Sequence, residues 1–281
     1  MRRSTGAITL AILYALTFGA TAAHSGESIF SELQGEPGLR SASALVLDSE
    51  GNRIFGKNVD TVRPIASITK LMTAMVVLDA GLDLDEPITI TRADRDTLKL
   101  TGSRLDFGAT LSRREMLLLA LMSSENRAAS ALGRTYPGGL SSFIAHMNYK
   151  ARSLGMHDTR FADPAGLNAQ NVSTATDLAK MVAATKAYPL ITLSTTTERM
   201  EVRPFSNRGP LVYGNTNRLL KNADWEIALS KTGYINEAGR CLVMQARIEG
   251  EEVSIVLLNS FGKLTPFGDS NRLRKWMLAS S

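Results

Sequence analysis

Near the end of the chain, three apolar segments (residues 227–234, 240–248 and 253–260) are joined by turns of a few residues. Gly239 lies in the first turn and Gly250 in the second. Connections this short join antiparallel neighbours, because parallel strands need a crossover of a dozen or more residues. The segments therefore predict a three-stranded antiparallel meander, which any fold of this chain must contain.

A hairpin is predicted at the other end, with strands over residues 43–48 and 53–56 and a Ser-Glu-Gly-Asn turn between them. The intervening sequence is helical in pattern. Helices are expected from Pro64 to Gly81 and over residues 117–122, 126–132, 140–154 and 176–187, with a last one over 272–278. The simplest packing joins hairpin and meander into one five-stranded antiparallel sheet (residues 41–56 and 227–281) covered by helices (residues 65–190). That is an α+β fold.

The first residues indicate export. Arg2 and Arg3 precede an apolar run over residues 7–18, and small residues follow up to Ala23. This layout is typical of a cleavable secretory signal peptide, residues 1–23, which leaves residues 24–281 as one catalytic domain in the periplasm. The alternative, an uncleaved membrane anchor, is disfavoured because the run is shorter than the roughly 20 residues of a membrane span.

The remaining composition excludes several classes. The net charge of +5 is not concentrated in Lys/Arg blocks with interleaved aromatics, so nucleic-acid binding is not indicated. The three histidines lack metal-ligand spacing, and no metal or other cofactor is predicted. The single cysteine, Cys241, excludes an internal disulfide.

The strongest chemical signal is a Ser-x-x-Lys motif at Ser67 and Lys70, near the start of the first predicted helix. On a helix, residues three apart share a face, so the amine can reach the hydroxyl. A serine needs such a base to become a nucleophile. A second match, Ser260 and Lys263, ends a strand and is followed by Pro266, so no helix is expected to align that pair.

Two further motifs accompany the first. Ser124 and Asn126 form the chain's single Ser-x-Asn, in a break between two buried helices. Lys231, Thr232 and Gly233 form its single Lys-Thr-Gly, on a predicted strand. Such a strand can offer a cation, a hydroxyl and backbone donors to an anionic substrate, and Gly233 leaves room for close approach.

These motifs, in this order, form the set found in β-lactamases and penicillin-binding proteins. From about Ser41 to its end, the sequence resembles the low-molecular-mass penicillin-binding proteins, which are D-alanyl-D-alanine peptidases. It is most similar to their endopeptidase (type-7) branch in residues 66–73, in residues 119–129, and in residues 231–234 together with 237–241. The resemblance implies a β-lactamase/transpeptidase-like fold with a helical subdomain.

The resemblance also implies roles. Ser67 would attack a D-Ala carbonyl of a peptidoglycan stem peptide and form an acyl-enzyme, and Lys70 would take its proton. Ser124 would relay a proton to the leaving amine, and Asn126 would hold the substrate amide. β-Lactams are expected as covalent inhibitors.

On the strand, Lys231 would stabilise charge and help to keep Lys70 neutral, and Thr232 would bind the substrate carboxylate. The backbone N–H groups of Ser67 and Tyr234 would form the oxyanion hole. A segment similar to residues 163–167 borders the active site in the family, which suggests a wall of the cleft here.

Cleavage of D-Ala–diaminopimelate cross-links is the favoured reaction, with trimming of a terminal D-Ala as the alternative. A β-lactamase is less favoured because no Glu-x-x-Leu-Asn segment is present, and a non-catalytic wall-binding protein because the motifs are intact. For the basic helix over residues 272–278, packing on the sheet is favoured over contact with a membrane surface.

Overall fold

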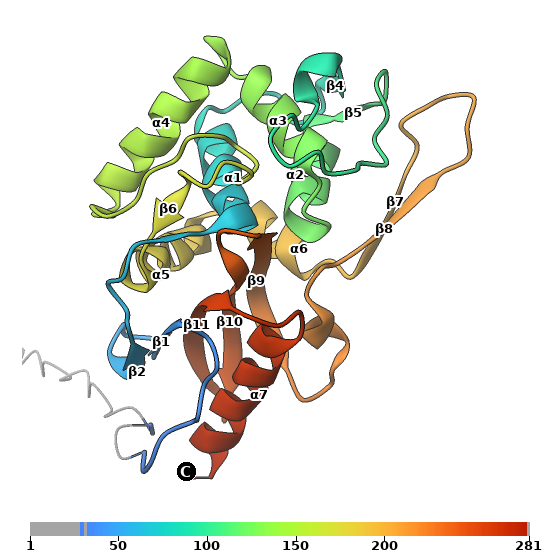
Figure 1. Ribbon diagram of the computed structural model, residues 1–281. Helices are drawn as coiled ribbons and strands as arrows, with labels where there is room; N and C mark the ends of the chain where they lie inside the picture. The colour runs from blue at the N-terminus through green and yellow to red at the C-terminus, as the bar shows by residue number, and fades with distance from the viewer. Residues whose placement is uncertain (1–28, 31–32, 280–281) are drawn as a thin grey trace, which may run out of the picture.

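The computed structural model describes residues 29–30 and 33–279 (Figure 1). The expected signal peptide, residues 1–23, lies outside the described residues. A five-stranded antiparallel sheet carries helix α7 (Thr265–Leu278) on one face and the larger helical part on the other (Figure 1). The predicted α+β fold is confirmed. None of the helices in the described ranges is long and apolar enough to cross a membrane.

The sheet is built from both ends of the chain, as predicted. In sheet order the strands are β2 (Arg53–Lys57), β1 (Ser43–Leu47), β11 (Glu251–Ser260), β10 (Gly239–Ile248) and β9 (Glu226–Ile235). The hairpin joins the meander through β1, where Ser43 lies opposite Leu258 and Leu47 lies opposite Ser254. Strand β9, which carries the Lys-Thr-Gly motif, is therefore an edge strand.

Alternation along the strands assigns residues to two cores. Leu242 and Met244 of β10 pack with Leu273 and Met277 of α7. Val243, between them, faces the other way and joins the larger core under the helical part. Helix α7 thus packs on the sheet, as its sequence predicts.

The helical part surrounds a central helix. Its elements are η1 (Ala66–Ile68), α1 (Thr69–Asp79), α2 (Arg113–Met122), α3 (Asn126–Arg134), α4 (Gly139–Ser153), α5 (Ala175–Ala184), η3 (Thr185–Ala187) and α6 (Pro189–Thr196). Helix α1 is buried from Thr69 to Val77, which explains its apolar sequence. Helix α2 starts with a capping box, in which the side chains of Ser112 and Glu115 each accept the other residue's backbone N–H.

Several short elements complete the fold. In the part of the chain that the structure describes, three strand pairs lie outside the main sheet: β3 (Arg63–Pro64) with β6 (Val172–Ser173), β4 (Pro87–Thr89) with β5 (Thr110–Ser112), and β7 (Arg199–Val202) with β8 (Leu211–Gly214). Two short 3₁₀ turns are η2 (Arg92–Asp94) and η4 (Arg218–Lys221). Helix α6 and the β7–β8 hairpin were not expected from the sequence. Helix α7 begins at Thr265 rather than at residue 272, because Pro266 sits in its first turn, where a missing N–H costs nothing.

The start of α7 is tied to the start of β1 by a buried carboxylate. Asp269 is fully buried and accepts the backbone N–H groups of Arg40 and Ser41, at 3.1 and 2.7 Å. It also accepts the Ser41 hydroxyl and the guanidinium of Arg272. Although burial opposes ionisation, these hydrogen bonds lower the pKa of Asp269.

We expect Asp269→Ala to lower the free energy of unfolding by roughly 1–3 kcal/mol, because it leaves buried donors without an acceptor. Urea denaturation checks this. Asp224→Ala, which removes an exposed carboxylate, is the control and should change the value by less than about 0.5 kcal/mol. Equal values for the two variants would contradict a role of Asp269 in holding α7 to β1.

Candidate active site

The predicted nucleophile lies in a strained turn. Ser67 is the middle residue of η1, immediately before α1, and is partly exposed. Ala66 before it has a φ of +47°, in the left-handed region that non-glycine residues rarely occupy. Such strain costs on the order of 1–3 kcal/mol and persists only where the surrounding structure imposes it.

Two glycines impose it. A Cβ on Gly166, whose φ is +80°, would lie 2.0 Å from the carbonyl oxygen of Ala66. A Cβ on Gly233 of β9 would lie 2.9 Å from the carbonyl oxygen of Ile65 and 3.1 Å from the amide nitrogen of Ser67. Backbone therefore packs against both sides of the turn, and only glycine permits this at either position.

Lys70 lies beneath the nucleophile. It is fully buried, and its Nζ donates to the Oγ of Ser67 at 2.9 Å, to the Oδ1 of Asn126 at 2.8 Å and to the carbonyl oxygen of Ala165 at 2.6 Å. Burial lowers the pKa of Lys70 to about 8, and the carboxylates of Asp163, Glu125 and Asp96 limit the shift. A neutral amine with a free lone pair is thus accessible near physiological pH.

A second buried lysine serves the second serine. The Nζ of Lys231 donates to the Oγ of Ser124 and to the carbonyl oxygen of Thr232, both at 2.9 Å. Burial lowers the pKa of Lys231 well below its usual value, and repulsion from Lys70 lowers it further. Ser124, between α2 and α3, has a φ of +61°, which is the second strained non-glycine backbone at the site.

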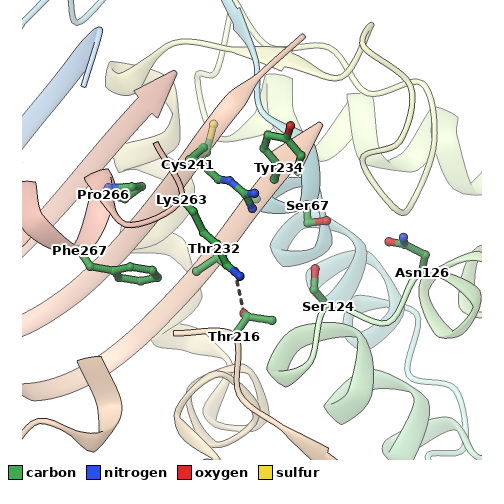
Figure 2. A pocket seen from close by; sticks show the side chains of 12 residues that line it. Ser67, Ser124, Asn126, Thr216, Thr232, Tyr234, Cys241, Lys263, Pro266 and Phe267 are labelled. Atoms are coloured by element: carbon green, nitrogen blue, oxygen red, sulfur yellow. Dashed lines mark hydrogen bonds between the residues drawn. The ribbon is translucent and has the colours of Figure 1, made fainter. Parts of the chain in front are cut away.

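One cleft collects the predicted residues. It has a volume of about 280 Å³ and is lined by Ser67, Ser124, Asn126, Thr216, Thr232, Gly233, Tyr234, Arg240, Cys241, Lys263, Pro266 and Phe267 (Figure 2). Figure 2 shows Ser67, Ser124 and Asn126 across from the strand that carries Thr232. Lys70 and Lys231 are buried and contact the two serines.

The structure adds residues that sequence reasoning missed. The Oγ1 of Thr216 accepts from that of Thr232 at 2.7 Å, and the Oγ1 of Thr101 accepts from the Nδ2 of Asn126 at 2.9 Å. Both threonines lie in irregular segments, where neither helix nor strand periodicity indicates which residues come together. Ala165 acts through its carbonyl group, which leaves no trace in the sequence.

The loop that carries Ala165 is held by its own side chains. The carboxylate of Asp163 accepts the backbone N–H groups of Ala165, Gly166 and Asn168, each at 2.6 Å. The Oγ1 of Thr73, on α1, donates to the carbonyl oxygen of Pro164 at 2.7 Å. The segment was expected to form a wall of the cleft, but none of residues 163–167 lines it. The segment instead fixes an acceptor for Lys70.

The second Ser-x-x-Lys pair has a different geometry. Ser260 is fully buried at the end of β11, where its Oγ lies 2.7 Å from that of Ser41. Lys263 follows in the turn before α7, and it lines the cleft. Cys241 is buried, and burial raises the pKa of its thiol to about 11, which makes it unreactive.

Within the described ranges, no group of three or more His, Cys, Asp or Glu side chains is placed to hold a metal ion.

Comparison with known proteins gives a consistent result. A family model described as D-alanyl-D-alanine carboxypeptidase matches residues 31–262. The chain is 47% identical to a D-alanyl-D-alanine endopeptidase of Escherichia coli (96% of this chain, 86% of the relative). It is 49% identical to one of Pseudomonas aeruginosa (85% and 77%). Among solved structures, the Streptomyces K15 DD-transpeptidase is similar, with a TM-score of 0.80, 28% identity and coverage of 88% of this chain and 100% of that one.

The packing of Gly166 on the nucleophile turn has a matched control. Gly155 has a similar φ of +70°, but a Cβ there would meet nothing within 4 Å. We expect Gly155→Ala to lower the free energy of unfolding by about 1 kcal/mol, the cost of a left-handed alanine. Gly166→Ala should lower it by at least about 2 kcal/mol more because of the clash. Equal losses in urea denaturation would show that the loop does not constrain the turn.

Proposed function

Because the chain belongs to the D-alanyl-D-alanine carboxypeptidase family, we propose that it is a serine D,D-peptidase that cleaves D-Ala–diaminopimelate cross-links in peptidoglycan. One observation carries the proposal. Two serine–lysine pairs, Ser67 with Lys70 and Ser124 with Lys231, meet in a single cleft beside an edge strand. Each serine hydroxyl has a buried amine at 2.9 Å, which is within reach for proton transfer.

Acylation starts with Lys70 in its neutral form. Lys70 takes the proton of Ser67 while Oγ attacks the D-Ala carbonyl carbon, and the peptide C–N bond then breaks. Ser124 passes a proton to the leaving amine and is re-protonated by the ammonium of Lys70, which becomes neutral again. Lys70 then takes a proton from the water that attacks the ester. When the bond to Oγ breaks, Oγ takes that proton from Lys70 and Ser67 is regenerated. The contacts of Lys70 with Asn126 and Ala165 keep its amine at the nucleophile during these steps.

Two backbone donors bind the oxyanion in this mechanism, the N–H groups of Ser67 and Tyr234. Gly233 supports the arrangement, because its missing side chain lets β9 lie against the nucleophile turn. Loss of one such donor typically costs about 10²–10³ in rate. Thr232 turns its hydroxyl proton from Thr216 to the carboxylate next to the scissile bond, and it then accepts a hydrogen bond from the Thr216 hydroxyl.

The relatives favour the endopeptidase reaction. Those at 47% and 49% identity are named endopeptidases, whereas those named carboxypeptidases, such as the ones from Streptomyces K15 and Bacillus subtilis, are 32% and 30% identical. Removal of a terminal D-Ala is the second candidate, because only the leaving amine differs. We place the enzyme in the periplasm after removal of residues 1–23, with stem peptides as substrates and β-lactams as covalent inhibitors.

Digestion of purified cross-linked muropeptides tests the proposal. The wild-type protein should convert dimers to monomers and bind a fluorescent penicillin covalently, and Ser67→Ala should abolish both. Ser260→Ala, which changes the serine of the other Ser-x-x-Lys pair, should keep both. Dimers that survive while pentapeptides lose D-Ala would assign a carboxypeptidase. Labelling that persists in Ser67→Ala would refute the nucleophile.

The lowered pKa of Lys70 predicts a pH profile. Because the neutral amine is the base and the pKa is about 8, the rate of acylation by penicillin should rise roughly tenfold per pH unit below pH 8 and level off above it. Labelling rates between about pH 5.5 and 9.5 would measure this, with circular dichroism confirming the fold at each pH. A constant rate between about pH 6 and 8 would exclude Lys70 as the base.

A further inference from the structure

The cleft extends beyond the residues that the reaction needs. It is also lined by Lys263, Pro266 and Phe267, which come from the turn after β11 and the start of α7 (Figure 2), and by Arg240 of β10. The register of the sheet determines which residues of β9 and β10 face the same side as α7. Arg240 lies opposite Tyr234, and Thr232 lies opposite Leu242, which packs under α7. Since alternate residues of a strand share a face, Thr232, Tyr234 and Arg240 all lie on the α7 face of the sheet.

The charges that line the cleft are of one sign. Among the residues that line the cleft, Arg240 and Lys263 carry charge and none is an Asp or Glu. Neither cation belongs to an ion pair formed by the described residues. The guanidinium carbon of Arg240 lies 3.6 Å from the centre of the Tyr234 ring, and this stacking holds it in place while its edge stays free to donate. Lys263 is exposed.

A single leaving D-Ala does not account for these cations. It carries one carboxylate, next to the scissile bond, and in the mechanism above Thr232 binds that group. When a cross-link is cut, the leaving group is a whole second stem peptide, with further carboxylates along its length. The cleft that contains Thr232 offers these groups two cations, which form no ion pair with the described residues.

We propose that Arg240 and Lys263 form an anion subsite for those further carboxylates of the leaving stem peptide, and that the subsite favours cross-links over a terminal D-Ala. This inference rests on the proposed function. Phe267 and Pro266 supply apolar contact for the peptide backbone between the two anchoring points. A charge-assisted hydrogen bond at the subsite contributes roughly a tenfold or greater gain in binding.

The test compares two reactions of the same active site. For the variant Arg240→Gln/Lys263→Gln, kcat/KM on a cross-linked muropeptide dimer should fall at least tenfold more than the rate of acylation by fluorescent penicillin, which has no second stem peptide. Lys263→Glu should show the same selective loss of kcat/KM on the dimer. Because Lys263 is exposed, this substitution should leave folding unchanged. The control Arg247→Gln/Lys275→Gln removes the same charge from β10 and α7 at exposed positions outside the cleft and should change neither rate.

A chemical control uses the substrate. Amidating only the further carboxylates of the leaving stem peptide, and not the one next to the scissile bond, should slow the wild-type enzyme as much as the double substitution does, and should add little to the loss in the variant. If both rates fall in parallel, or if the variant cleaves dimers as fast as wild type, the subsite is refuted. If wild type cleaves no dimers but labels with penicillin, the endopeptidase proposal itself fails.

Discussion

The contact on which the molecule depends lies between three backbones. The turn at Ala66 and Ser67 is held between the loop at Gly166 and the edge strand at Gly233, and neither glycine can carry a side chain there. This contact joins the helical part to the sheet and sets the position of Ser67 relative to the Lys-Thr-Gly strand. The left-handed backbone of Ala66 is a consequence, because the turn has to fit between two surfaces that are both fixed by larger structures.

Two buried amines follow from this packing. Lys70 and Lys231 are buried between the helical part and the sheet, and burial lowers the pKa of each below its usual value. A charged amine in such a place needs acceptors, and for Lys70 these are a hydroxyl, an amide oxygen and a backbone carbonyl. A full carboxylate partner would hold the proton too firmly for a base. The neutral acceptors orient the amine without fixing its charge.

Much of this could be predicted from the sequence, and the exceptions have physical reasons. The sheet was predictable because its strands are long and its turns are short. The pairs Ser67–Lys70 and Ser124–Asn126 could be identified because helix spacing and a helix break leave regular signals. Helix α6 and the β7–β8 hairpin were missed because the apolar residues in 189–214 follow neither the helical period of 3.6 residues nor the strand period of two clearly. The roles of Ala165 and Gly166 were missed because these residues act through backbone atoms. The contact of Thr216 was missed because a single threonine belongs to no motif with a recognisable spacing.

Strand β9 ends the sheet, and its Lys-Thr-Gly segment borders the cleft. An unpaired strand edge can lead to aggregation, because it offers hydrogen bonds to any other extended chain. In the described part of the chain, Ser67, Ser124 and Asn126 line the same cleft as the Lys-Thr-Gly segment and lie across from it (Figure 2). Another extended chain can pair with this part of β9 only by entering the cleft. The walls of the cleft therefore restrict access to the part of the sheet edge that would otherwise be open.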